Sequence, residues 1–554
     1  MAPNPENTTH RGQIIDLHAG RIFPGAIDVR DGTINAIRES ADGDVPSGYL
    51  CPGFVDAHVH IESSMLPPVE FGRVAVVHGT VATVSDPHEI ANVLGVEGVR
   101  AMQRMAASTP CKIHLGIPSC VPATGFESAG AVIDASAVEE LCRDRSLTYL
   151  AEMMNFPGVV GGDPEVMRKI DIAKRHGKRI DGHAPGLRGE GLQAYVRAGI
   201  TTDHECADID EAREKLALGQ KILIREGSAA KNFEALWPLL LESPGNCMFC
   251  SDDKHPDDLM EGHINQLCAR AVAAGVPVME ALRAACLTPA QHYQLRSGSL
   301  QPGDPADFIR LADLQSFAVL ETWIDGACVA RDGRSMLPAV APEIVNQFHC
   351  APQRPGDFSM PIPEHELPGK TCLRVIEAID GSIVTGAAEM AACVRDGHAI
   401  ADPARDLLKI TVVNRYQPAP PAVAFVRGIG LKQGAIASSV AHDCHNIVAV
   451  GCDDESLAKA VNLVIEHRGG ISVVGPQGCD TLALPIAGLM SDQPAEQVAA
   501  AYSRITDRAK ELGSTLHAPY MTLSFLALLV IPSLKLGDRG LFDGNTFQFT
   551  SPFV

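Results

Sequence analysis

Residues 52–60 read PGFVDAHVH, a short apolar run that follows a Pro-Gly turn and ends in two histidines. Side chains two positions apart on a β-strand point to the same face, so the imidazoles of His58 and His60 can reach one metal ion. An H-x-H pair alone is a weak signal, because such pairs also arise by chance on exposed strands. At the end of the first strand of a barrel, the pair predicts part of a metal centre.

Seven further apolar runs follow this stretch, and amphipathic segments such as residues 165–177 and 209–219 lie between them. These segments are long enough for crossover helices, so the alternation predicts βα units on a parallel sheet. Eight such units favour closure into an α/β fold of the TIM type, a (β/α)8 barrel. The runs are Phe54–Val59, Thr80–Val84, Ile113–Ile117, Tyr149–Met153, Arg179–His183, Thr201–His204, Ile222–Arg225 and Cys247–Ser251.

Histidines and carboxylates stand at or just after the carboxyl ends of these runs. In a (β/α)8 barrel this rim carries the chemistry. A single buried histidine is usually structural, but six ligand-type residues at matching positions are hard to explain as structure. We therefore expect one metal site built from His58, His60, Glu152, His183, His204 and Asp252.

The expected ligand set mixes imidazoles with carboxylates, which suits Zn, Fe or Mn rather than Ca. We expect Glu152 to bridge two cations, although a carboxylate bonded to a helix N-terminus or to an arginine is the structural alternative. His183 and His204 would bind the second ion, and Asp252 would ligate the first ion and face the hydroxide. Two cations acting together lower the pKa of a shared water and present hydroxide at neutral pH.

The segments on either side of the expected barrel, residues 51–295, have a different pattern. Residues 1–50 and 296–345 hold short β-like segments between Gly, Asp and Pro turns, and they are expected to pair into one small β domain. Residues 346–370 are rich in proline and predict a linker. Residues 371–554 alternate strand and helix patterns and are long enough for an additional C-terminal α+β domain.

Length and charge narrow the class of protein. The 554 residues exceed what one hydrophobic core organises, and a net charge of −21 disfavours nucleic acid and anionic membranes as partners. No apolar run reaches the ~18 residues that span a bilayer. The N-terminal sequence MAPNPENTTHRGQ lacks the apolar stretch of a signal peptide. We therefore expect a soluble, cytoplasmic protein.

The 16 cysteines are scattered through the chain, and without a secretory signal they are expected to be reduced thiols. One pair, Cys247 and Cys250, has the C-x-x-C spacing. Residues three apart on a strand face opposite sides, and no second pair stands nearby in the sequence to complete a zinc site. We expect no metal or redox role for this pair.

Longer segments resemble the successive sequence signatures of the adenine deaminases, a family of the amidohydrolase superfamily. The resemblance runs from about residue 14 to the C-terminus, and several of its motifs exceed eight residues, which excludes chance. The matching segments are PGFVDAHVHIESSMLPP, TVSDPHEIANVLG, PSCVPATGFE, EMMNFPGV, DGHAPGL, TTDHECAD, REGSAAKN, SDDKHPDDL, VVNRY, GLKQGAIASSVAHDCHNI, LPIAGLMSD and FLALLVIPSLKL. Two departures, Cys444 where the family has Ser and Thr288 where Asn is commoner, bear on substrate preference rather than on the expected ligands.

The resemblance implies a metal-bearing (β/α)8 barrel with a small β domain and an extra C-terminal domain. It also implies hydrolytic deamination of adenine to hypoxanthine and ammonia in purine salvage, by a metal-activated hydroxide that attacks C6 of the base. Asp252 is the expected group for proton transfer from the hydroxide to a ring nitrogen or the departing amine. The cofactor would be a binuclear divalent centre, with manganese or iron expected and zinc compatible. The resemblance further implies a small-molecule purine as the substrate and a homo-oligomer, a dimer or larger.

Four residues near the strand ends are candidates for substrate binding. His88 and Glu89 follow the second run and could hydrogen-bond the purine or support a metal ligand. Arg225 ends the seventh run and could bond a ring nitrogen or form a salt bridge to Glu226 or another neighbour. Asp253 could accept a hydrogen bond from the substrate or cap the following segment.

The C-terminal motif HDCH places His442, Asp443 and His445 within four residues. Such a motif resembles a small metal site or a proton relay. A polar packing cluster explains it equally well. The sequence leaves both readings open.

Three other functions compete with adenine deamination. A hydrolase of cyclic amides typically bridges its metals with a carboxylated lysine on the fourth strand, where this chain offers Glu152. A deaminase of a substituted aminopurine such as N6-methyladenine would need only a few changes in the cavity. A non-catalytic protein with a decayed barrel predicts lost ligands, whereas all six ligand-type residues are present.

Overall fold

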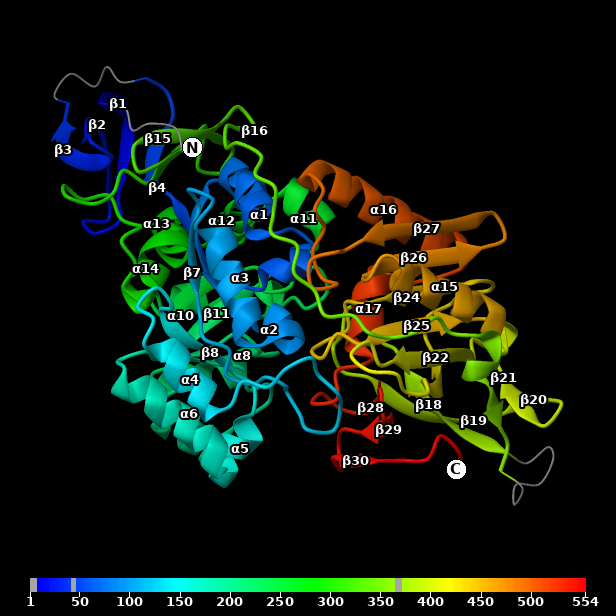
Figure 1. Cartoon of the computed structure of the whole chain (residues 1–554). Helices are drawn as coiled ribbons and strands as arrows, with labels where there is room; N and C mark the ends of the chain where they lie inside the picture. Colours follow the sequence, from blue (N-terminus) through cyan, green and yellow to red (C-terminus); the bar gives the residue numbers. More distant parts are fainter. Residues whose placement is uncertain (1–6, 41–45, 364–370) are drawn as a thin grey trace.

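The computed structural model describes residues 7–40, 46–363 and 371–554. Figure 1 shows three regions: a small sheet that contains the N-terminal strands, a central region of strands and helices, and a C-terminal region drawn in yellow-green to red. The central region lies between the other two. None of the described helices is both long enough and apolar enough to cross a membrane.

The small sheet is built from chain segments on both sides of the central region. Its eight strands run in the order β16-β15-β14-β13-β4-β1-β2-β3. β4 joins the two halves, because it pairs with β1 on one side and with β13 on the other. Every second residue of β2 is buried, which is the period expected of a strand with one covered face. The strands are β1 (Thr8–Asp16), β2 (Arg21–Arg30), β3 (Thr33–Glu39), β4 (Tyr49–Pro52), β13 (Phe308–Leu311), β14 (Val319–Ile324), β15 (Ala327–Arg331) and β16 (Arg334–Ser335).

The central region contains eight strands that coincide closely with the eight apolar runs. They form parallel groups β5-β6-β7, β8-β9 and β10-β11-β12. Bridges from Ile117 to Leu150 and from Val59 to Asp252 link these groups, and a backbone hydrogen bond of 2.9 Å joins Thr201 to Ile180. Backbone contacts thus run from each strand to the next and from the last strand back to the first. The strands are β5 (Phe54–Val59), β6 (Thr80–Ser85), β7 (Lys112–Leu115), β8 (Tyr149–Met153), β9 (Arg179–Gly182), β10 (Thr202–Asp203), β11 (Lys221–Arg225) and β12 (Cys247–Cys250).

Helices between these strands begin and end at recognisable signals. In α6, Asp163 accepts hydrogen bonds from the first turn, Pro164 occupies the first helical position and Arg175 lies in the last turn. The helices are α1 (Pro68–Ala75), α2 (His88–Leu94), α3 (Val96–Ala106), α4 (Ala135–Cys142), α5 (Phe156–Gly161), α6 (Pro164–Arg175), α7 (Gly189–Arg197), α8 (Ile209–Ala217), α9 (Phe233–Leu236), α10 (Leu239–Glu242), α11 (Pro256–Glu261), α12 (Ile264–Ala273), α13 (Val278–Leu282) and α14 (Thr288–Tyr293). Short turns of other helical types are η1 (Ile61–Ser64), η2 (Val76–His78) and η3 (Arg283–Leu287).

The C-terminal region has a second eight-stranded sheet, in the order β19-β18-β23-β22-β25-β24-β26-β27. Helix α15 packs its apolar side, with Leu457, Val461 and Val464, onto this sheet. Its helices and turns are η4 (Pro355–Phe358), η5 (Pro403–Arg405), α15 (Asp454–Glu466), α16 (Ala495–Glu511) and α17 (Pro519–Phe525). Its strands are β17 (Met360–Pro361), β18 (Cys372–Glu377), β19 (Gly386–Ala391), β20 (Cys393–Arg395), β21 (His398–Ile400), β22 (Leu408–Val413), β23 (Ala422–Arg427), β24 (Ala435–Ser438), β25 (Ile447–Gly451), β26 (Gly470–Gly475), β27 (Gly478–Ala483), β28 (Leu534–Gly537), β29 (Gly540–Asp543) and β30 (Gln548–Phe549).

The proline-rich segment expected to be a linker packs against the C-terminal region. Phe348 and Phe358 are buried in the same cluster as Val461, and β17 pairs with β21. Residues 364–370 of this segment lie outside the described residues. High proline content predicts little regular structure. The segment is nevertheless held against the C-terminal region, because the side chains of Phe348 and Phe358 bury apolar surface there.

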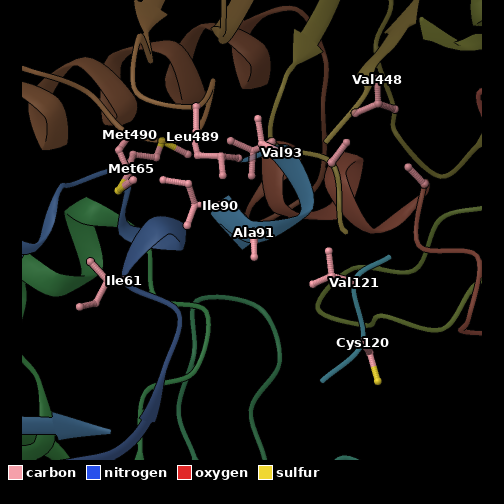
Figure 2. Packing of buried hydrophobic residues seen from close by; sticks show 14 of the residues in the cluster. Ile61, Met65, Ile90, Ala91, Val93, Cys120, Val121, Val448, Leu489 and Met490 are labelled. Atoms are coloured by element: carbon pink, nitrogen blue, oxygen red, sulfur yellow. The ribbon is translucent and has the colours of Figure 1, made fainter. Parts of the chain in front are cut away.

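Helix α2 is where the central and C-terminal regions meet. Its apolar residues Ile90 and Val93 belong to one buried cluster with Leu489 and Met490 of the C-terminal region (Figure 2). Nearby, the backbone N–H of Ser491 donates to the carbonyl of Met65 over 2.8 Å. The start of α2, which carries His88 and Glu89, is therefore held against both regions.

Candidate active site

Glu152 lies at the centre of the residues expected to bind metal. This buried β8 side chain has one oxygen, Oε1, 3.2 Å from His60 Nε2. Its other oxygen, Oε2, lies 2.7 Å from His183 Nδ1 and 3.1 Å from His204 Nε2. The two carboxylate oxygens thus face separate sets of imidazoles, which is the arrangement that a group between two cations requires.

His58, His60 and Asp252 form the other half of the cluster. The Nε2 atoms of the two histidines are 3.2 Å apart, and Asp252 Oδ1 lies 3.4 Å from His58 Nε2 and 3.2 Å from His60 Nε2. The last strand places Asp252 here, because its backbone N–H donates to the carbonyl of His58 over 2.9 Å. All six expected ligands therefore come together at the carboxyl ends of the strands.

The donor atoms of this cluster fit divalent cations. Groups such as His58, His204 and Asp252 offer ligand atoms that all lie within 4.8 Å of one another. Two imidazole nitrogens that face each other at 3.2 Å need a proton or a cation between them. A buried set of imidazoles and carboxylates matches the preferences of Mn, Fe and Zn.

The carboxylates of the cluster are held in their charged form. Burial alone would raise the pKa of Glu152, but His183, His204 and His60 outweigh it and hold the pKa well below its ordinary value. Burial opposes ionisation of Asp252 too, and Arg225 is the main group that holds its pKa low. Charged carboxylates are the form that binds metal.

Arg225 forms a salt bridge inside the cluster, which was one of its two expected roles. Its Nη1 donates to Asp252 Oδ2 over 2.7 Å, and its Nη2 donates to Glu205 Oε2 over 3.2 Å. The partner is not Glu226, which pairs with Arg270 at 2.6 Å. Glu205 is a site residue that the sequence reasoning missed, although its place directly after His204 at a strand end was the available signal.

His88 and Glu89 point to different neighbours. His88 Nδ1 lies 3.1 Å from Asp86 Oδ2 and 3.3 Å from Glu152 Oε1, so Asp86 fixes the ring beside the metal cluster. Glu89 faces the C-terminal region, where His442 Nδ1 donates to its Oε1 over 2.7 Å. Of the expected alternatives, the geometry gives His88 a place at the cluster and Glu89 a place between regions.

Asp253 lies on the cavity wall next to the cluster. Ser63 Oγ donates to its Oδ1 over 2.5 Å. Burial and the neighbouring charge of Asp252 raise the pKa of Asp253.

Cys247 and Cys250, the pair with C-x-x-C spacing, are buried on β12. Burial raises the pKa of the Cys247 thiol to about 12, so this thiol stays protonated at neutral pH.

A cavity opens beside the cluster, and two regions line it. The central region contributes polar side chains, among them five of the six expected ligands: His60, Glu152, His183, His204 and Asp252. The C-terminal region contributes most of the apolar wall. The lining residues from the C-terminal region are Ile383, His442, Asp443, Phe525, Leu528 and Val530.

Known proteins resemble this chain along its whole length. The model of the amidohydrolase family matches residues 49–329, and that of the adenine deaminase C-terminal domain matches residues 382–548. The adenine deaminase of Salinibacter ruber is 53% identical over 552 residues, which cover 99% of this chain and 100% of that protein. The adenine deaminase of Methanosarcina mazei is 48% identical, with 98% and 99% covered.

Among solved structures, the N-acetyl-D-glucosamine-6-phosphate deacetylase of Mycobacterium smegmatis has a TM-score of 0.46 and 17% identity, over 58% of this chain and 100% of that chain. The matches to adenine deaminases, by contrast, extend over both the central and the C-terminal region. They confirm the resemblance that the sequence motifs indicated. This chain belongs to the adenine deaminase family of amidohydrolases.

Proposed function

We propose that this protein hydrolyses adenine to hypoxanthine and ammonia. The observation that carries the proposal is the meeting of six ligand-type residues, from five strand ends, beside one cavity. Membership of the adenine deaminase family, at about half identity over the whole chain, supplies the substrate. The comparisons favour neither a cyclic-amide hydrolase nor a deaminase of N6-methyladenine.

The proposed scaffold is a (β/α)8 barrel of residues 51–295 with strands β5–β12. Residues 1–50 and 296–345 form the small β domain, residues 346–370 connect it onward, and residues 371–554 form the C-terminal domain. Support comes from the return of backbone contacts from β12 to β5. In such a barrel the carboxyl ends of the strands carry the active site.

The proposed cofactor is a pair of divalent cations, manganese or iron, with zinc compatible. His58, His60 and Asp252 would hold one ion, His183 and His204 would hold the other, and Glu152 would lie between them. Two cations bound there would lower the pKa of a shared water and would supply hydroxide at neutral pH.

The residues around the cluster have different roles in proton transfer and positioning. Asp252 takes the proton of the attacking water and passes it to a ring nitrogen or to the departing amine. Arg225 fixes Asp252 through Oδ2, which leaves Oδ1 directed at the cluster. His88, held by Asp86, is a second group that can carry a proton at the cavity. The water oxygen adds to C6 and one water proton goes to the adjacent ring nitrogen. The second water proton then passes from the C6 hydroxyl to the amino nitrogen, the bond from C6 to that nitrogen breaks, ammonia leaves and C6=O remains.

The test is a hypoxanthine assay on protein stripped of metal and reconstituted separately with Mn, Fe and Zn. We expect turnover of adenine to return with metal and to disappear in the Asp252→Asn variant. Asp210→Asn is the matched control, because Asp210 is an exposed acid on α8. Protein that binds two ions per chain but leaves adenine unchanged would show that the substrate is wrong. Homo-oligomerisation and a cytoplasmic location stay predictions.

A further inference from the structure

Two polar atoms on the C-terminal side of the cavity lack a hydrogen-bond partner among the described residues. They are Oδ2 of Asp443 and Nε2 of His442. Both residues line the cavity, and they are 3% and 4% exposed. A buried polar atom without a partner costs free energy, so these two atoms are expected to meet a ligand.

The contacts behind His442 fix which nitrogen faces the cavity. Its Nδ1 donates to Glu89 Oε1 over 2.7 Å, and its ring stacks on Phe525 with centroids 5.0 Å apart. The other oxygen of Glu89 accepts from Nε2 of His445, whose Nδ1 in turn accepts the N–H of Ala441 over 3.3 Å. Both oxygens of Glu89 are therefore occupied by N–H donors, and the ring of His442 is held with Nε2 free.

A cation is a poor match for this position. One atom from each of His88, Glu89 and Asp443 lies within 4.8 Å of the others, a spacing that a metal could fill. The two oxygens of Glu89 already accept hydrogen bonds from His442 and His445, which lowers their value as ligands. The free acceptor of Asp443 is better matched by an N–H group of an organic ligand.

Adenine carries N–H groups at two places, on the amino group at C6 and on the imidazole half of the ring. The carbon that is attacked, with its amino group, must face the metal cluster. The ring N–H is then the donor that remains for a side chain of the C-terminal region. The apolar side chains of Phe525, Leu528 and Val530 beside it suit the faces of a flat base.

We propose that Asp443 accepts the ring N–H of the purine, with His442 donating to a neighbouring ring nitrogen, and that this pair restricts the site to free bases. The inference rests on the proposed function. A purine substituted at N9, as in a nucleoside, has no ring N–H and leaves Asp443 unpaired. Burial lowers the pKa of His442, but Glu89 and Asp253 outweigh it and raise the pKa to about 9, which keeps Nε2 a donor at neutral pH.

The test compares hypoxanthine with 9-methylhypoxanthine, which lacks the imidazole N–H but keeps the N–H at N1, as ligands of the metal-loaded protein. Dissociation constants come from calorimetry, so the result does not depend on turnover. We expect wild-type protein to bind hypoxanthine about 10- to 100-fold more tightly than the methylated base. In Asp443→Ala, affinity for hypoxanthine should fall by the same factor, while affinity for 9-methylhypoxanthine stays constant or rises. Asp443→Asn keeps an acceptor oxygen and should lose less.

Asp538→Asn is the matched control, because Asp538 is a nearly buried acid of the same region that bonds Ser128 and Asn414 outside the cavity lining. It should leave the preference between the two ligands unchanged. Equal loss of both ligands in Asp443→Ala and Asp443→Asn would overturn the proposal, and so would wild-type protein that binds both equally well. Failure of wild-type protein to convert adenine would instead overturn the proposed function, which the calorimetric comparison does not assume.

Discussion

The central and C-terminal regions hold their cavity side chains by different means. Strand pairing fixes the cluster of the central region, as in the hydrogen bonds between the backbones of His58, His60 and Asp252. Side-chain packing fixes the wall of the C-terminal region, as in the contacts of His442 with Glu89 and Phe525. The central side is charged and mutually paired, whereas the C-terminal side is mostly apolar with two free polar atoms. We infer that chemistry belongs to the first region and recognition of the base to the second.

The largest expected effect removes the centre of the cluster. Glu152→Gln takes the charge from the group that faces His60, His183 and His204, so the protein should lose bound metal and adenine turnover should fall about a thousandfold or more. Metal content per chain and kcat measure this. Glu139→Gln, at a carboxylate on α4 outside the cavity, is the control. Retention of two ions with normal kcat would remove Glu152 from the metal centre.

Breaking the buried charge pair behind the cluster should cost stability. Arg225→Met leaves Asp252 and Glu205 without their cation, and the free energy of unfolding should fall by about 3 kcal/mol or more. Arg213→Met removes an exposed pair with Glu242 and should cost less than about 1 kcal/mol. Urea unfolding measures the free energy of unfolding of each variant. Equal losses of this free energy in the two variants would contradict the prediction.

A substitution on α2, where the central and C-terminal regions meet, should weaken binding of adenine without affecting binding of metal. Ile90→Ala opens a cavity between α2 and the C-terminal residues Leu489 and Met490, at a cost of about 2–4 kcal/mol. Because α2 carries Glu89 and so holds His442, KM for adenine should rise while metal content stays normal. Val138→Ala, at a buried position of α4, is the control for loss of stability alone. A loss of metal in Ile90→Ala would show that the two regions are not separable.

The smallest expected effect concerns a buried lysine under the cavity wall. Nζ of Lys535 donates to the carbonyls of Ile383 and Phe525, and burial lowers its pKa to about 7. The unfolded chain, with a pKa near 10.4, binds more protons than the folded chain above about pH 7, so stability should rise with pH between these values. The gain in Tm from pH 7 to pH 9.5 should shrink by roughly 2–4 °C in Lys535→Met. If the rise in Tm from pH 7 to pH 9.5 is the same in Lys535→Met as in the wild-type protein, other groups cause the pH dependence.

The strands and the cluster could be predicted from the sequence because both depend on local patterns. Each strand of the central region is a short apolar run, and each expected ligand stands at or next to the carboxyl end of such a run. The contact of Glu89 with His445 could not be predicted, since the two residues are 356 positions apart and meet only through packing. Glu205 was missed because its role depends on the direction of the Arg225 side chain. The packing of Phe348 was missed because proline content reports on regular structure and not on burial.

The residues of the C-terminal region that line the cavity come late in the sequence, so they are also made late in synthesis. A ribosome adds residues in the order of the sequence, so His58 through Asp252 are made before Phe525, Leu528 and Val530. Those last side chains line the cavity. A nascent chain can therefore assemble the residues of its metal cluster early, but it has no finished binding site for a base until those later side chains have been added.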